Sequence, residues 1–180
     1  MFTHRQWFTR KQLIVCSLIC CSAALADENP GLGEAMDADK IAAVSFTVLP
    51  DGTGLPPGSG DASAGEEIYR ANCLACHGEG GVDGINDRLV GGRGSISSPK
   101  PLKTVGSYWP YATTLFDYIR RAMPFQTPGS LSADEVYSVT AYVLYMNEIV
   151  ERNQKIDADS LPQVKMPNRD NFRWAVGGGH

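Results

Sequence analysis

The segment Cys73-Leu-Ala-Cys76-His77 constrains this chain more than any other feature of its sequence. Cysteines three residues apart face the same way on a helix, so their two thiols can reach one edge of the same flat ligand. The imidazole of the next residue then lies where it can bind a metal at the centre of that ligand. The pattern therefore predicts covalent attachment of one haem c at Cys73 and Cys76, with His77 as an axial ligand of the iron.

The first 26 residues predict a secretory signal peptide. Three basic residues precede the apolar run 13–25, which ends in Ala24-Leu25-Ala26. The run is shorter than the about 20 residues that a membrane-spanning helix needs, and no second run of that length follows it. We expect an exported, periplasmic and soluble mature protein, with a lipid anchor at Cys20 or Cys21 as the alternative.

Cleavage after residue 26 would change both the cysteine count and the charge. It leaves 154 of the 180 residues, enough for one domain with extensions, and only two of the five cysteines. The mature chain then has 13 basic and 20 acidic residues, a net charge of −7, which argues against nucleic acid as a partner.

Three other uses of the cysteine pair remain open. A structural zinc site needs four ligands, and beyond the motif itself only His180 offers another soft or nitrogen donor. A thioredoxin-like redox pair is typical of a βαβ pattern, which the sequence lacks. A disulfide between residues three apart would close a very short loop and stabilise the fold little.

The pattern along the chain predicts an all-α domain at residues 61–150. A Gly/Pro-rich extension at 27–60 precedes it, with one possible short strand in which Val44, Phe46 and Val48 alternate with smaller residues. An irregular tail at 151–180 follows it. Between residues 78 and 106 the chain is glycine-rich and predicts a loop.

Three helices are predicted in this domain. The first begins near Ser63, where Ser63 and Glu66 have capping-box spacing, and runs into Cys76; Gly65 within it marks the close approach of another element. The second covers 111–122 and ends because Pro124 disfavours helical geometry at the preceding residue. The third begins after Ser132, which forms a capping box with Glu135.

The second axial ligand of the iron is predicted to be Met123. Its position before Pro124 turns its side chain off the end of a helix, whereas Met146 belongs to an apolar helix stripe. Met166, beyond the last helix, is the alternative. Ligation by histidine and methionine leaves no open position on the iron, so we expect electron transfer and no catalysis at the haem.

Three further residues have two readings each. Arg120 and Arg121 precede Met123 and could pair with haem propionates or with an acidic partner, or they are ordinary solvated charges. Trp109 could donate its indole N–H to a propionate, or it fills the haem pocket.

Three longer segments carry a resemblance to a known family: 103–125, 50–60 and 166–169. With them the sequence resembles the class I c-type cytochromes and, more narrowly, the SoxD-type cytochrome subunit of the Sox sulfur dehydrogenase. The resemblance implies a class I cytochrome c fold, with three to four helices around one haem. It assigns Cys73 and Cys76 to the thioether bonds and His77 and Met123 to the iron.

The resemblance also implies partners. It predicts the redox subunit of a periplasmic molybdenum-cofactor enzyme that oxidises sulfane sulfur, with another cytochrome as the electron acceptor. Two alternatives remain: a free carrier that serves a respiratory oxidase, and the cytochrome subunit of a sulfite dehydrogenase.

Overall fold

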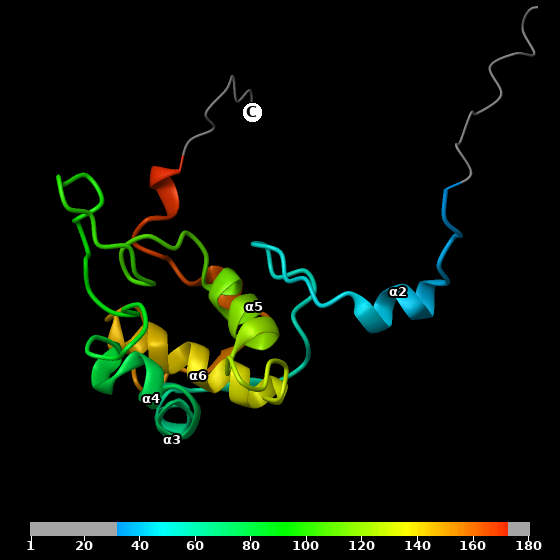
Figure 1. Cartoon of the computed structure of the whole chain (residues 1–180), viewed down its shortest axis with the longest axis horizontal. Helices are drawn as coiled ribbons and strands as arrows, with labels where there is room; N and C mark the ends of the chain where they lie inside the picture. The colour runs from blue at the N-terminus through cyan, green and yellow to red at the C-terminus, as the bar shows by residue number, and fades with distance from the viewer. Residues whose placement is uncertain (1–31, 173–180) are drawn as a thin grey trace, which may run out of the picture. The chain divides into compact units, whose positions relative to one another are not determined.

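The computed structural model describes residues 32–172, apart from the side chains of residues 42 and 43 (Figure 1). The chain divides into two units, residues 1–41 and 42–180, and the second holds the cysteine motif. The predicted signal peptide, with Cys20 and Cys21, and His180 therefore lie outside the described residues. No helix within 32–172 is both long and apolar enough to span a membrane.

Helices make up most of the regular structure, which confirms the predicted all-α class. In chain order the elements are α2 (Ala38–Val44), β1 (Ser59–Gly60), α3 (Ala62–Asn72), α4 (Leu74–His77), η1 (Glu79–Gly81), α5 (Ala112–Ala122), α6 (Ala133–Met146), β2 (Ile156–Asp157), η2 (Leu161–Gln163) and η3 (Arg169–Asn171).

Helix α6 is the centre of the 42–180 unit, and α3 crosses it (Figure 1). The predicted capping box starts α6: Ser132 Oγ accepts from the Glu135 amide, and the Glu135 carboxylate accepts from the Ser132 amide at 2.7 Å. A Cβ at Gly65 would lie 1.9 Å from the carbonyl oxygen of Ser138, so only glycine permits this contact with α3. The close approach predicted at Gly65 is thus confirmed.

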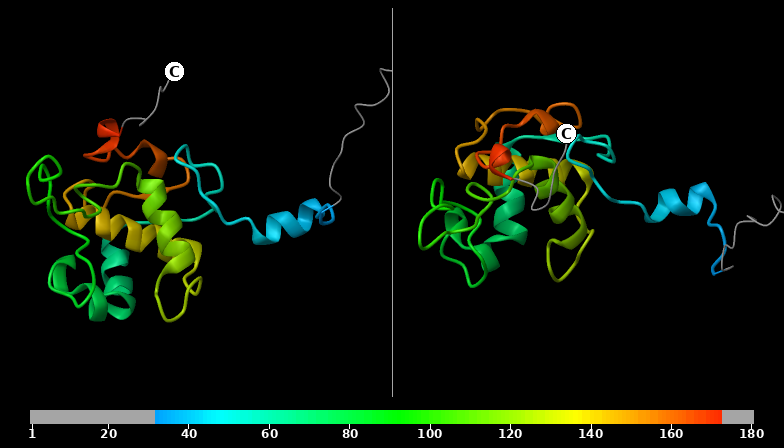
Figure 2. Two further views of the ribbon diagram at one scale, coloured as in Figure 1. Left: turned by 45° about the horizontal axis from the view of Figure 1, so that its top comes forward. Right: turned by 90° about the horizontal axis from the view of Figure 1, so that it is seen from above.

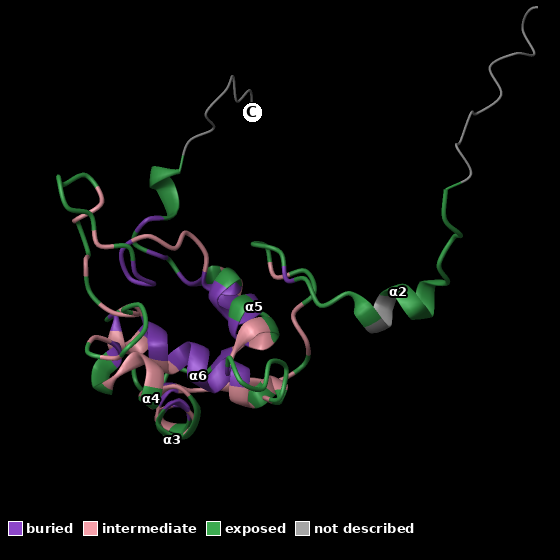
Figure 3. Cartoon of the chain, in the orientation of Figure 1, coloured by how far each residue is buried: buried purple, intermediate pink, exposed green. Residues whose placement is uncertain are grey.

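Helix α5 packs against another part of α6 and completes the core. Phe116 and Tyr137 face one another there, with ring centroids 4.5 Å apart. Figure 3 shows the buried residues on the facing sides of α5 and α6 and the exposed ones on the outer side of α5. Helix α5 ends at Ala122, as Pro124 predicts.

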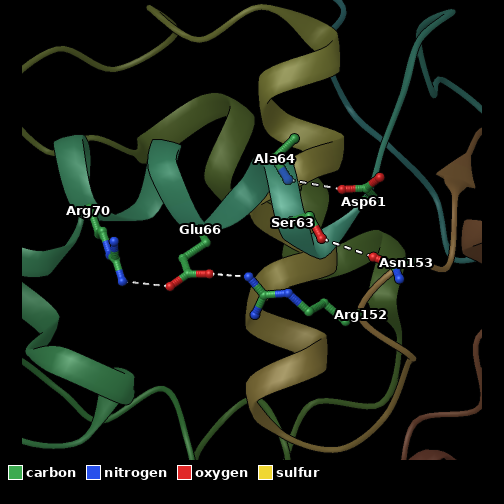
Figure 4. A network of polar contacts seen from close by, with 7 residues as sticks. All are labelled: Asp61, Ser63, Ala64, Glu66, Arg70, Arg152 and Asn153. Carbon is green, nitrogen blue, oxygen red and sulfur yellow. Dashed lines mark hydrogen bonds and ion pairs between the residues drawn. The ribbon is translucent and has the colours of Figure 1, made fainter.

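The first helix begins at Ala62, close to the predicted start near Ser63, but the predicted capping residue is wrong. Asp61, not Ser63, caps α3, and its carboxylate accepts from the Ala64 amide at 2.9 Å. Glu66 turns instead toward two guanidinium groups, those of Arg70 and Arg152 (Figure 4). The hydrogen bond from Arg152 lowers the pKa of Glu66. The ion pair with Arg152 shows that this carboxylate joins α3 to the segment after α6 and does not cap the helix.

The same helix also stops before the motif that it was predicted to include. It ends at Asn72, and Cys73 has φ −122° and ψ −32°, outside regular helical geometry. The motif continues in the separate four-residue helix α4. The cysteine motif therefore does not continue the helical geometry of α3.

The strand predicted at Val44–Val48 is not formed. Val44 ends helix α2, and Val48 lies in a segment without regular structure. Val48 is nevertheless buried, and its amide donates to Asp117 Oδ1 of α5 at 3.0 Å. The Val48 amide is therefore satisfied by a buried carboxylate and not by a neighbouring strand.

The segment 151–172 is more ordered than the predicted irregular tail. Its residues Ile156 and Asp157 pair antiparallel with Ser59 and Gly60. Figure 2 shows it, orange to red, along one side of the helices in both views. Four of its apolar side chains are buried in the core: Ile156, Leu161, Val164 and Met166.

Candidate haem site

The cysteine motif lies at the junction of α3 and α4. Cys73 separates the two helices, and its carbonyl accepts the amides of Cys76 and His77 at 3.1 and 2.9 Å. Both cysteines are partly buried, and no disulfide joins them. The short turn therefore keeps the two thiols and the imidazole within one compact segment.

The loop after the motif folds back against it through glycines. Gly78 has φ +78°, which favours glycine, and it directs the chain back toward α4. A Cβ at Gly84 would lie 2.1 Å from the carbonyl oxygen of Cys76, and the Asn86 amide donates to that same oxygen at 2.9 Å. The backbone of this loop thus fixes the position of the motif.

His77 is oriented by a hydrogen bond from its ring. Its Nδ1 lies 3.0 Å from the carbonyl oxygen of Asp87. A carbonyl oxygen only accepts, so Nδ1 must carry the proton and the neutral ring keeps its Nε2 lone pair for a metal. The tautomer and the orientation that an axial ligand requires are therefore built into the loop.

The surroundings of Cys73 disfavour its thiolate form. Burial, together with the nearby Cys76, raises its pKa to about 11. A thioredoxin-like cysteine needs a lowered pKa, because the thiolate is the nucleophile. Within residues 32–172 there is also no group of three or more His, Cys, Asp or Glu side chains placed to hold a metal ion.

Met123 follows α5 directly in extended geometry, with φ −126° and ψ 145°. Its amide still donates to the carbonyl of Ile119, at 3.0 Å, so the helix end fixes where the side chain begins. Met123 is partly buried, whereas Met166 is 3% exposed and packed in the core. The placement off a helix end matches the sequence argument for Met123.

Several apolar side chains at the edge of the core are left partly exposed. They come from α4, the glycine-rich loop, the segments before and after α5 and the turn before α6: Leu74, Leu89, Trp109, Met123 and Leu131. A planar and largely apolar group suits such side chains, because contact with it would remove more of their surface from water. These side chains and the His77 ring are of the kind that haem needs around it.

Comparison with known proteins agrees with this geometry. Residues 60–143 match the family model described as cytochrome c oxidase, cbb3-type, subunit III. The crystal structure of the sulfane dehydrogenase SoxCD from Paracoccus pantotrophus contains a chain with 43% sequence identity and a TM-score of 0.73, and the match covers 79% of this chain and 71% of that one. The chain belongs to the SoxD-type c-type cytochromes.

A second relative of this cytochrome is the thiosulfate dehydrogenase of Allochromatium vinosum. The two are 33% identical over 87 residues, which is 47% of this chain. The cytochrome spans about a third of that protein, 31% of its length.

The arginines and the tryptophan considered for the haem propionates have other partners in the cytochrome. Arg121 pairs with Asp117, and the Arg120 guanidinium lies over the Phe46 ring, 5.8 Å from its centroid. Trp109 meets the Tyr118 ring edge to face at 5.8 Å.

Two functional contacts were missed in the sequence. Asp87 acts through its backbone carbonyl, which no side-chain pattern signals, and Tyr69 donates its hydroxyl to the Gly78 carbonyl at 2.9 Å. Burial raises the pKa of Tyr69 to about 12, so the hydroxyl stays protonated as a donor. The glycines at 78 and 84 were the available signal, since they allow the loop to return to the motif.

Proposed function

We propose that this cytochrome is the periplasmic electron-transfer subunit of a molybdenum-dependent enzyme that oxidises sulfane sulfur, and that it carries a single haem c. The observation that carries the proposal is the match to SoxCD, at 43% identity over 79% of the chain. The similarity to a thiosulfate dehydrogenase points to the same class of sulfur substrate.

Four residues would hold the haem. Cys73 and Cys76 would form the thioether bonds, and His77 and Met123 would be the ligands of the iron. When bound, haem supplies an iron that gains and loses one electron. The Asp87 carbonyl favours the His77 tautomer that such a ligand needs. Ligation by both His77 and Met123 would leave no position on the iron for a substrate, so the proposed role is electron transfer.

The test is reconstitution of electron transfer with the partner. The full chain would be produced in a periplasm that attaches haem, purified with any molybdenum protein that accompanies it, and mixed with a sulfane sulfur substrate under anaerobic conditions. We expect the haem to become reduced as the molybdenum subunit turns over. A haem that stays oxidised in the assembled complex would contradict the proposal.

A freely diffusing carrier for a respiratory oxidase is the competing function, because the matching family model is named after an oxidase subunit. Truncation of residues 151–180 is a poor way to distinguish the two, since it would remove Ile156 and Leu161, both fully buried. Complex formation with the molybdenum subunit separates them instead. A free carrier would exchange electrons with an oxidase and form no stable complex with a molybdenum protein.

A further inference from the structure

The outer face of α5 exposes side chains that are not among the four candidate haem-binding residues. Thr114, Tyr118 and Arg121 follow one another at helical spacing on this face, and all three are exposed. Phe125 follows just beyond the helix end. Tyr118 is 48% exposed and Phe125 is 76% exposed. We refer to these four residues as the α5 stripe.

The segment before β1 extends this surface. Phe46 and Leu49 are both exposed, while Val48 between them is buried and held by Asp117 of α5. Arg120, next to the stripe, lies over the Phe46 ring. The buried Val48 thus fixes an exposed phenylalanine beside α5, so the aromatic surface belongs to the folded unit.

The charge of this surface is opposite to that of the chain. The chain has a formal net charge of −4. Helix α5 instead has two arginines, and its one carboxylate, Asp117, is buried and paired with Arg121. Tyrosine, phenylalanine and arginine are the residues enriched in protein interfaces, and tyrosine and arginine are common among those that contribute most to binding.

We propose that the α5 stripe and Phe46 form the docking surface for the molybdenum-containing subunit, which would present an apolar patch rimmed by carboxylates. This inference rests on the proposed function. Helix α5 ends at Ala122, directly before Met123, so the docked subunit would lie next to the segment that carries the second proposed iron ligand. Arginines at the rim would speed association and orient the two proteins, while the aromatic rings would hold the complex.

The first experiment measures the affinity of the full-length, haem-loaded cytochrome for the purified molybdenum subunit by titration calorimetry. Phe125→Ser and the double variant Tyr118→Ser/Phe125→Ser are compared with Ile85→Ser. Ile85 is a matched control because it is 86% exposed and lies in the loop after the motif. We expect Kd to rise at least about tenfold in the double variant and to change less than about twofold in the control.

The second experiment tests the charge. Arg120→Gln/Arg121→Gln is compared with Arg88→Gln, whose side chain is 51% exposed and 3.7 Å from Asp83. We expect the association rate to fall and its dependence on salt to weaken in the first variant only, because rim charges act mainly on encounter. An unchanged visible spectrum shows that each variant keeps its haem and its fold.

The outcomes separate this inference from the function on which it rests. If the unmodified cytochrome does not bind the molybdenum subunit, both are wrong. If it binds, but the stripe variants bind equally well, only the docking surface is wrong. If the variants instead dissociate a homodimer seen by sedimentation, with no loss of affinity for the molybdenum subunit, the occupant is a second copy and the inference is overturned.

Discussion

The two segments that carry the proposed iron ligands are held in different ways. On the His77 side, the loop through Gly84 presses backbone against backbone, and the Asp87 carbonyl fixes the ring. On the Met123 side, the side chain is placed by the end of α5, and residues 125–130 beyond it are exposed. The first segment is fixed by tertiary backbone contacts, whereas the second depends mainly on where a helix stops.

The two segments should differ most in how much stability they lose when a glycine is replaced by alanine. In Gly84→Ala the new Cβ would meet the Cys76 carbonyl oxygen, a backbone atom that cannot move away without shifting the motif. In Gly129→Ala it would meet no atom within 4 Å, and only the φ of +74° is unfavourable. We expect the free energy of unfolding to fall by about 3 kcal/mol or more in the first variant and by about 1 kcal/mol in the second.

Urea unfolding of both haem-loaded variants measures this difference. If both variants lose the same free energy of unfolding, the loop after the motif accommodates a Cβ as easily as the exposed loop after Met123. That result would contradict the comparison.

A second prediction concerns the methionine itself. Met123→Leu keeps the volume of the side chain but removes the sulfur, so the charge-transfer band between iron and methionine in the oxidised protein should disappear. Met166→Leu is the matched control, because Met166 is buried in the core: we expect the band to remain and stability to fall by less than about 1.5 kcal/mol. Visible spectra of the oxidised variants give the answer. If the charge-transfer band is lost only in Met166→Leu, the methionine ligand of the iron is Met166 and not Met123.

Alkaline pH should lower the free energy of unfolding, because two tyrosines are buried in the folded protein. Burial raises the pKa of Tyr69, beside the motif, and of Tyr137, against α5, from 10 to about 12. Between these values the unfolded chain binds fewer protons than the folded one, so the free energy of unfolding falls as the pH rises from 10 to 12.

Tyr69→Phe and Tyr137→Phe should each remove part of this slope. At neutral pH each should cost about 1 kcal/mol, because the hydroxyls donate to the carbonyls of Gly78 and Pro56. Urea unfolding of the haem-loaded protein across this pH range measures both effects. If neither substitution changes the dependence of the free energy of unfolding on pH, groups other than these tyrosines cause the loss of stability at alkaline pH.

The smallest predicted change in stability concerns Thr140 in α6. The Thr140 hydroxyl is buried and has no hydrogen-bond partner among residues 32–172. Thr140→Val replaces it with a methyl group of similar size, so we expect the free energy of unfolding to stay the same or to rise by up to about 1 kcal/mol. Thermal unfolding of the haem-loaded protein measures this change, and a clear loss of stability would reveal a partner for the hydroxyl.

Signals confined to a few neighbouring residues predicted the fold well. The capping box at Ser132, the helix end before Pro124 and the close approach at Gly65 are all confirmed. The Ser63 cap and the strand at Val44–Val48 are wrong, although each also had a valid local pattern. In both cases a distant group competes for the same atoms: Arg152 for Glu66, and Asp117 for the Val48 amide.

The sequence by itself determined the c-type motif, the candidate ligands and the end of α5 before Met123, because each depends on the spacing of residues within one or two turns. Only the tertiary structure decided which carbonyl orients His77, how the loop closes on the motif and that the 151–172 segment belongs to the core. The last of these features joins residues far apart in the sequence: Ser59 and Asp157, for example, pair although they are 98 positions apart. Contacts of that kind follow from how the elements pack, and no local pattern encodes them.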